Sequence, residues 1–144
     1  MTRALVVDDD ETIRDTLYEL LSENYICQTA ETAEKAMARL QADPYDVVLT
    51  DISMPGLSGL ELLGQVRQRF PQTPVIVISG ISDKEHAEGL IRLGAFDYLL
   101  KPFSLDEVEK SVKRAVDYRR RLLEQSGGAG TSTEDDTSDW KIVT

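Results

Sequence analysis

The sequence is poor in the residues that build disulfide frameworks and histidine-based sites. Among 144 residues there is one cysteine, Cys27, and one histidine, His86. A single cysteine excludes an internal disulfide framework and is typical of a reducing compartment. We predict that Cys27 is a small buried hydrophobic residue. No acid or cysteine motif surrounds His86, so we assign it no role.

Positive charge is also scarce. The chain has 16 Lys and Arg against 26 Asp and Glu, a formal net charge of −10. This balance argues against direct contact with nucleic acid, which needs a basic surface, and against an anionic membrane surface. No apolar run approaches transmembrane length, and residues 1–7 lack the layout of a signal peptide. We therefore expect a cytoplasmic protein with no membrane partner and no direct nucleic-acid contact by this segment.

Short apolar runs alternate regularly with helical patterns. Each run is typical of a buried strand in a parallel sheet, and each following segment has apolar residues at helical spacing. The alternation predicts an α/β fold of the flavodoxin-like (βα)₅ type, a three-layer sandwich whose five-stranded parallel sheet has the order 2-1-3-4-5. The predicted strands lie near residues 5–7, 25–30, 46–51, 74–79 and 96–100, and the helices near 13–21, 32–42, 58–70, 82–93 and 104–125.

The composition changes after residue 125. Glycines at 127, 128 and 130 precede an acidic segment rich in Ser and Thr, and residues 140–143 (Trp-Lys-Ile-Val) are typical of the start of another element. We predict one domain over residues 1–125. Residues 126–144 would form a flexible acidic tail or a linker to an output domain absent from these residues, and both options stay open.

Polar side chains follow four of the predicted strands. Asp8 and Asp9 end the first strand, Asp51 the third, Ser79 the fourth and Lys101 the fifth. The carboxyl ends of parallel strands share one edge of the sheet, so three carboxylates would crowd together there and require a cation. Oxygen ligands without His or Cys favour Mg²⁺ (or Mn²⁺). The lysine and the hydroxyl suit phosphate oxygens, which indicates phosphoryl transfer with a carboxylate as nucleophile.

Four motifs together resemble the receiver domain of response regulators in two-component signalling. They are Val6-Val7-Asp8-Asp9-Asp10, Leu49-Thr50-Asp51-Ile52-Ser53-Met54-Pro55-Gly56, Val77-Ile78-Ser79-Gly80 and Asp97-Tyr98-Leu99-Leu100-Lys101-Pro102-Phe103. Each motif falls in its expected strand context, and the resemblance spans residues 3–125.

The resemblance implies a role for each site residue. Asp51 would be the phosphoacceptor, and Lys101 would pair with the acyl phosphate. Asp9 would bind Mg²⁺ directly and Asp8 mainly through water, with the Asp51 carboxylate and the Ser53 backbone carbonyl completing the protein ligands. The donor would be a sensor histidine kinase or a phosphotransfer protein. The domain would phosphorylate itself and at most slowly hydrolyse the product, so it would not be an enzyme acting on an external substrate.

The same resemblance implies a switch. Ser79 would move toward the phosphate, Tyr98 would turn inward behind it, and the peptide bond between Lys101 and Pro102 would be cis. The surface of the helix near 82–93, the strand 96–100 and the helix 104–125 would change and be recognised by an output domain, a downstream protein or a second copy in a homodimer. Two positions depart from the family pattern: Ser79 where threonine is commoner, and Gly80 where alanine is usual. The hydroxyl is retained, so we expect the function to survive.

Three other functions compete with this prediction. Asp8, Asp10 and Thr12 resemble the first motif of haloacid-dehalogenase-type phosphatases, with Asp8 as nucleophile and Asp10 as general acid/base. Ser79 and Lys101 would be the second and third motifs, but no acidic pair follows Lys101 and Asp51 would have no role. A phosphate-independent receiver-like interaction module would usually have lost part of the acceptor set. A flavin-binding protein of this fold would need a phosphate loop after the first strand, where acids stand instead.

For several residues a purely structural role is the simpler prediction. Asp10 is predicted to be a helix N-cap. Tyr98 is by default an edge-strand aromatic that packs on the helix 104–125. The basic run of residues 119–121 is expected to complement the dipole at the end of that helix.

Overall fold

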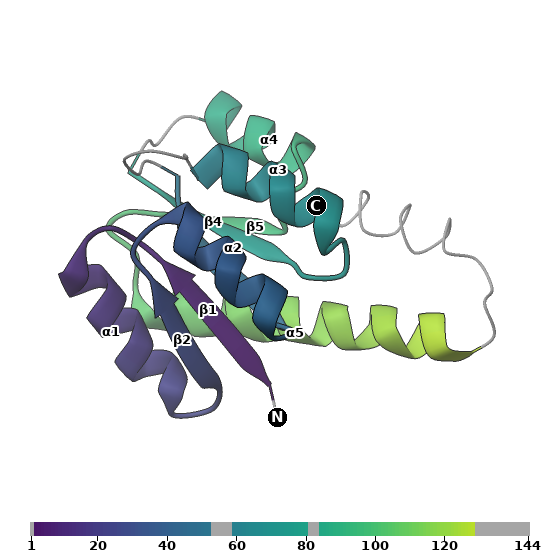
Figure 1. Cartoon of the computed structure of the whole chain (residues 1–144). Helices are drawn as coiled ribbons and strands as arrows, with labels where there is room; N and C mark the ends of the chain where they lie inside the picture. Colours follow the sequence, from purple (N-terminus) through teal and green to yellow (C-terminus); the bar gives the residue numbers. More distant parts are fainter. Residues whose placement is uncertain (1, 53–58, 81–83, 129–144) are drawn as a thin grey trace.

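The computed structural model describes residues 2–52, 59–80 and 84–128 and has the predicted (βα)₅ architecture (Figure 1). Five parallel strands form one sheet in the order β2-β1-β3-β4-β5, which confirms the predicted fold class. The strands are β1 (Arg3–Val7), β2 (Ile26–Ala30), β3 (Val47–Asp51), β4 (Val75–Ser79) and β5 (Asp97–Leu100). The helices are α1 (Glu11–Ser22), α2 (Ala33–Ala42), α3 (Gly59–Arg69), α4 (Lys84–Arg92) and α5 (Leu105–Gly128).

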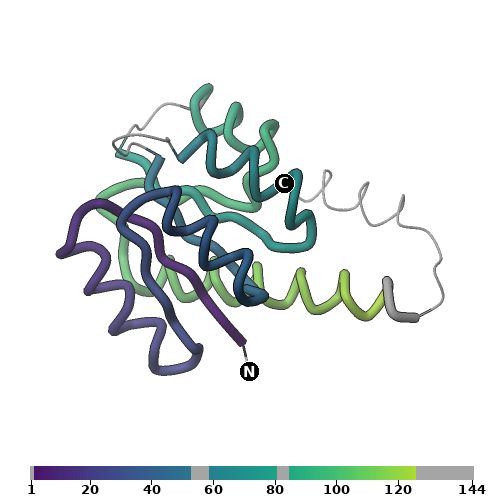
Figure 2. Tube along the Cα trace, viewed as in Figure 1, coloured from purple at the N-terminus to yellow at the C-terminus, as the bar shows by residue number. Residues whose placement is uncertain are grey.

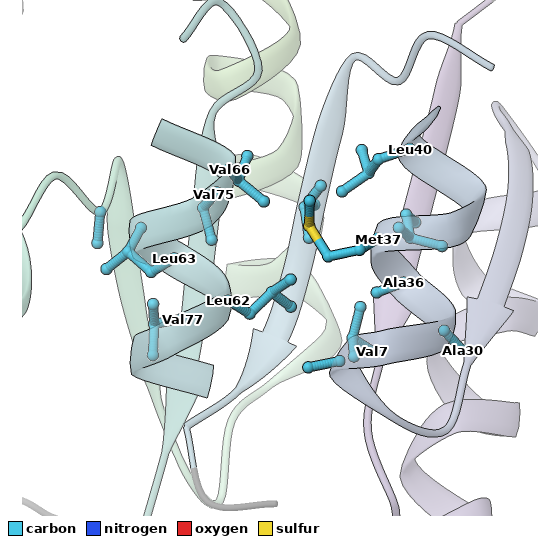
Figure 3. Close-up of a cluster of buried hydrophobic side chains, with 14 of the residues drawn as sticks. Val7, Ala30, Ala36, Met37, Leu40, Leu62, Leu63, Val66, Val75 and Val77 are labelled. Atoms are coloured by element: carbon cyan, nitrogen blue, oxygen red, sulfur yellow. The ribbon is translucent and has the colours of Figure 1, made fainter. Parts of the chain in front are cut away.

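Helices cover both faces of the sheet because both faces of its central strands are apolar. On one face, β1, β3 and β4 pack under α2, α3 and α4 in a cluster that includes Val7, Val48 and Val77. Figure 3 shows the part of this cluster between the sheet and the helices α2 and α3. On the other face, α1 and α5 cover a second cluster that includes Val6, Leu49 and Ile78. Successive strand residues point to opposite faces, so adjacent positions fall in different clusters. Each buried aliphatic side chain contributes about 1.5–3 kcal/mol of transfer free energy.

Side-chain caps mark where α1 and α5 begin, and a glycine marks where α4 ends. Asp10 caps α1, accepting from the amides of Thr12 and Ile13 as predicted. The Ser104 hydroxyl accepts from the Glu107 amide at the start of α5 (3.1 Å). After α4, Gly94 adopts a φ of 109°, a conformation that glycine reaches without the steric cost of a side chain.

Helix α5 is longer than the sequence pattern predicted. It continues to Gly128, three residues past the predicted end at residue 125, and its last turns extend beyond the sheet (Figures 1 and 2). Extending a formed helix is much easier than nucleating one, so a helix can continue into residues of low helix propensity. The predicted domain boundary stays a prediction, since residues 129–144 lie outside the described residues. None of the described helices is long and apolar enough to span a membrane.

Two structural predictions about α5 are wrong. Tyr98 does not pack on α5, because its position on β5 directs it to the cluster beneath α2, α3 and α4. Both faces of the sheet are covered, so strand alternation alone could not assign its face. Arg119 is not in the last turn of its helix and does not simply complement the dipole. Its guanidinium donates to the carboxylate of Asp46 (2.8 Å), just before β3. Cys27 is buried, as predicted.

Candidate functional site

Three carboxylates converge at the carboxyl ends of β1 and β3. Asp8 and Asp9 follow β1 directly, and Asp51 is the last residue of the adjacent strand β3. One carboxylate oxygen from each of the three lies within 4.8 Å of the others. Asp8 is fully buried, Asp51 is 7% exposed and Asp9 faces solvent. The predicted crowding of acids at the sheet edge is therefore present.

Backbone hydrogen bonds hold the amide and one carboxylate oxygen of Asp8 in place. The Asp8 amide donates to the carbonyl of Ala30 on β2 (3.1 Å), and its Oδ1 accepts from the Asp10 amide (2.9 Å). Oδ2 is buried and has no hydrogen-bond partner among the residues that the structure describes. A buried carboxylate oxygen without a partner is costly, so this atom indicates a position where a cation or a donor belongs.

Burial raises the pKa of Asp8 from its ordinary value of 3.8 to about 6. The hydrogen bond from the Asp10 amide lowers this pKa, the charge of Asp51 raises it, Lys101 lowers it, and Asp9 raises it. The largest effect is the loss of water around a charged oxygen, and the neighbouring acids add to it. A bound cation would remove this cost by supplying the missing positive charge.

Two further residues complete the site: Ser79, the last residue of β4, and Lys101, which directly follows β5. Lys101 Nζ lies 3.5 Å from Asp51 Oδ1, and the lysine side chain is largely shielded from water. The Lys101 amide donates to the carbonyl of Ser79 (2.8 Å), so the two residues share one backbone contact. Ser79 is fully buried at the end of β4, and the peptide bond between Lys101 and Pro102 is cis, as expected.

Gly59, which the sequence analysis did not single out as a site residue, lies against the backbone of the candidate acceptor. A Cβ added to Gly59 would stand 2.1 Å from the carbonyl oxygen of Asp51 and 2.6 Å from the Cα of Ile52. The Gly59 amide also donates to the Ile52 carbonyl (3.1 Å). The first residue of α3 therefore touches the end of β3, an approach open only to glycine. Its one signal in the sequence is a glycine in the first turn of a helix.

The structure brings together five of the predicted site residues. Asp8, Asp9, Asp51, Ser79 and Lys101 share the sheet edge, whereas Ser53 lies outside the described residues. Tyr98 is half-buried on β5, two residues before the end of that strand. The Asp10 side chain caps α1, which leaves it poorly placed for the general acid/base role that the phosphatase alternative requires.

The residues present are suited to a hard divalent cation. Magnesium binds through one or two carboxylates and keeps water or phosphate in the remaining positions. The carboxylates of Asp8, Asp9 and Asp51 provide oxygen donors only, and the buried Oδ2 of Asp8 is one of the atoms that a cation or its water would satisfy.

Comparison with known families agrees with this geometry. The model of the response regulator receiver domain family matches residues 4–113. The chain belongs to the response regulator receiver domain family.

The similar proteins are regulators of this class. The chain is 44% identical over 114 residues to the DNA-binding transcriptional regulator NtrC of Salmonella typhimurium, covering 78% of this chain and 24% of that protein. It is 34% identical over 125 residues to the response regulator protein PilR of Pseudomonas aeruginosa, covering 86% of this chain and 28% of that protein. The chain thus spans about a quarter of the length of these curated relatives.

Solved structures share the fold. The receiver domain of NtrX from Brucella abortus superposes with a TM-score of 0.75 at 38% identity, covering 79% of this chain and 98% of that one. NtrX crystallised in complex with ATP gives a TM-score of 0.81 at 36% identity, covering 86% of this chain and 29% of that one.

Proposed function

We propose that this chain is a phosphorylation-dependent switch in which Asp51 accepts a phosphoryl group from the histidine of a sensor kinase or a phosphotransfer protein. One observation carries the proposal: a nearly buried carboxylate at a strand end lies beside a lysine 3.5 Å away and two further acids within 4.8 Å. Membership of the receiver family supports this assignment. The domain is a self-phosphorylating acceptor with at most slow hydrolysis of its own product, and it does not act on an external substrate.

In the transfer, a carboxylate oxygen of Asp51 forms a bond to phosphorus. The bond between phosphorus and the donor's imidazole nitrogen breaks, and its electron pair returns to the imidazole ring. The position of Asp51 supports this role, since it faces the sheet edge at the end of β3 with 7% exposure. The Lys101 ammonium would hold the phosphoryl oxygens, because it is a mobile point charge already next to this carboxylate.

Asp8, Asp9 and Asp51 would hold a magnesium or manganese ion, with the Ser53 carbonyl as a further ligand. A bound Mg²⁺ supplies positive charge that offsets the acids and the phosphoryl oxygens. Asp8, whose carboxylate is buried, would act mainly through water, and Asp9, which is exposed, would bind directly.

The signal would leave through the surface of α4, β5 and α5. Ser79 would donate its hydroxyl to the phosphoryl group, and its backbone link to Lys101 supports coupled movement of β4 and β5. Tyr98 would follow by turning inward on β5. This surface would contact an output domain, a downstream protein or a second copy. Residues 126–144 would form either a flexible acidic tail or a linker to such an output domain.

The direct test is the intact mass of the protein after incubation with Mg²⁺ and a small acyl phosphate. We expect the wild type to gain one base-labile phosphoryl group, and Asp51→Asn or added chelator to prevent it. Asp15→Asn, an exposed acid of α1, serves as the matched control and should be phosphorylated normally. If the wild type gains no phosphoryl group and also fails to bind a beryllofluoride phosphate mimic with Mg²⁺, the proposal is wrong.

The switch has its own test. Hydrogen exchange of α4, β5 and α5 should change when the wild type binds Mg²⁺ and beryllofluoride. In Lys101→Ala this change should be lost. An unchanged exchange response in Lys101→Ala would show that the lysine is structural only.

A further inference from the structure

Arg14 on α1 contacts the acidic loop, residues 8–10, which follows β1. It is not one of the residues to which the proposed function assigns a role. Its Nη1 donates to the backbone carbonyl of Asp8 (2.9 Å), and the side chain is half-buried. Its charge also lowers the pKa of Glu31, which follows β2, although the Lys35 partner of Glu31 has the larger effect. The guanidinium therefore lies at the rim of the site, near the ends of β1 and β2.

The hydrogen bond from Arg14 completes the fixing of Asp8. The Asp8 amide is bound by Ala30, its Oδ1 by the Asp10 amide and its carbonyl by Arg14. The remaining oxygen, Oδ2, is buried, has no partner within residues 2–52, 59–80 and 84–128, and belongs to the carboxylate group that converges with Asp51. The orientation of this peptide thus decides where the Asp8 carboxylate stands. Groups that orient metal ligands from outside the ligand shell commonly change metal affinity by tenfold or more.

We propose that Arg14 is a positioning residue for the divalent-cation site: by holding the Asp8 carbonyl, it keeps the Asp8 and Asp9 carboxylates directed toward Asp51. This inference rests on the proposed function, because it concerns the cation that the transfer to Asp51 would use. Arg14 does not bind the cation itself, since a guanidinium cannot be a metal ligand.

A positioning role and a purely electrostatic role predict opposite effects. A positive charge at the rim repels a divalent cation, so removing the charge alone would strengthen binding of Mg²⁺. Removing the hydrogen bond would let the Asp8 peptide turn, which would weaken binding. Lysine keeps a charged donor that can reach a carbonyl, so Arg14→Lys should restore part of the affinity.

The test is isothermal titration of the metal-free protein with Mg²⁺, for the wild type, Arg14→Ala, Arg14→Lys and the control Lys35→Ala. Lys35 is an exposed cation that pairs with Glu31 and makes no bond to the Asp8 loop. We expect the dissociation constant for Mg²⁺ to rise about tenfold in Arg14→Ala, to recover partly in Arg14→Lys and to stay unchanged in Lys35→Ala. Thermal unfolding of the metal-free variants establishes that each is folded.

An unchanged or lowered dissociation constant in Arg14→Ala would overturn the inference. The phosphorylation assay separates this failure from failure of the proposed function. If the wild type is phosphorylated on Asp51 while Arg14→Ala binds Mg²⁺ normally, only the positioning role is wrong. If the wild type neither binds Mg²⁺ nor is phosphorylated, the proposed function itself fails.

Discussion

Gly59 lies so close to Asp51 that a single methyl group on the glycine would stand 2.1 Å from the aspartate's carbonyl oxygen. The contact is between two backbones, so no flexible side chain can move to relieve it. The first turn of α3 therefore fixes the end of β3, and with it the position of the candidate acceptor. The site depends on this contact although Gly59 supplies no chemical group to it.

Gly59→Ala should accordingly weaken both folding and phosphorylation. We expect the free energy of unfolding to fall by about 2–4 kcal/mol, because relief of the clash must shift α3 or β3. Urea denaturation and the rate of phosphorylation by a small acyl phosphate are the measurements.

Gly64→Ala is the matched control for this variant. Gly64 lies in the same helix, is exposed and would place its Cβ in open space, so alanine should stabilise the helix by up to about 1 kcal/mol. A Gly59→Ala protein as stable and as readily phosphorylated as the wild type would contradict the contact described above.

The raised pKa of Asp8 predicts that this residue destabilises the metal-free protein at neutral pH. The pKa is about 6 in the folded protein against 3.8 ordinarily, so the folded state binds a proton more tightly than the unfolded state does. The stability that protonation provides is complete below about pH 4 and is lost as the pH rises through 6.

Asp8→Asn should therefore raise the free energy of unfolding by up to about 3 kcal/mol at pH 7.5 in chelator, with the advantage shrinking toward pH 4. Urea denaturation at several pH values measures this difference in the free energy of unfolding. Asp15→Asn, which changes an exposed acid, should stay within about 0.5 kcal/mol of the wild type at every pH. An Asp8→Asn protein that is less stable than the wild type at pH 7.5 would show that the acid is not destabilising there.

The ion pair between Arg119 and Asp46 predicts unequal roles within the basic run of α5. Arg119 Nη1 lies 2.8 Å from Asp46 Oδ1, and Asp46 Oδ2 accepts from the backbone amide of Arg3 (2.8 Å). Both ionic side chains are largely shielded from water, at 15% and 23% exposed. Arg119→Ala should cost about 1–3 kcal/mol, since it leaves Asp46 without its charged partner.

Arg120→Ala should cost less than about 0.5 kcal/mol, because Arg120 is 61% exposed and lies 3.9 Å from its acidic neighbour Asp117. A double-mutant cycle of Arg119→Ala with Asp46→Asn isolates the coupling between the pair. Equal losses in Arg119→Ala and Arg120→Ala would mean that the pair contributes nothing beyond helix formation.

Much of the site could be predicted from the sequence because a parallel sheet brings strand ends together. Once the apolar runs are identified, Asp8, Asp51, Ser79 and Lys101 must share one edge, whatever the details of packing. The N-cap of α1 at Asp10 could also be predicted, because an aspartate stands directly before the first helical residues.

Contacts between distant segments could not be predicted in this way. The partners Asp46 and Arg119 are 73 positions apart, and no spacing rule joins them. The face on which Tyr98 packs depends on how β5 lies between two helical layers, and both layers are apolar. The approach of Gly59 to Asp51 depends on where α3 begins relative to β3, which is a tertiary distance.

The most direct measurement of the central claim is to identify the phosphorylated carboxylate. The protein is phosphorylated with a small acyl phosphate and Mg²⁺, reduced with borohydride, which converts an aspartyl phosphate to homoserine, and digested for mass spectrometry. We predict homoserine at position 51 alone. Homoserine at position 8 would contradict the account and support the phosphatase-type use of Asp8, and homoserine at position 9 would equally exclude Asp51 as the acceptor.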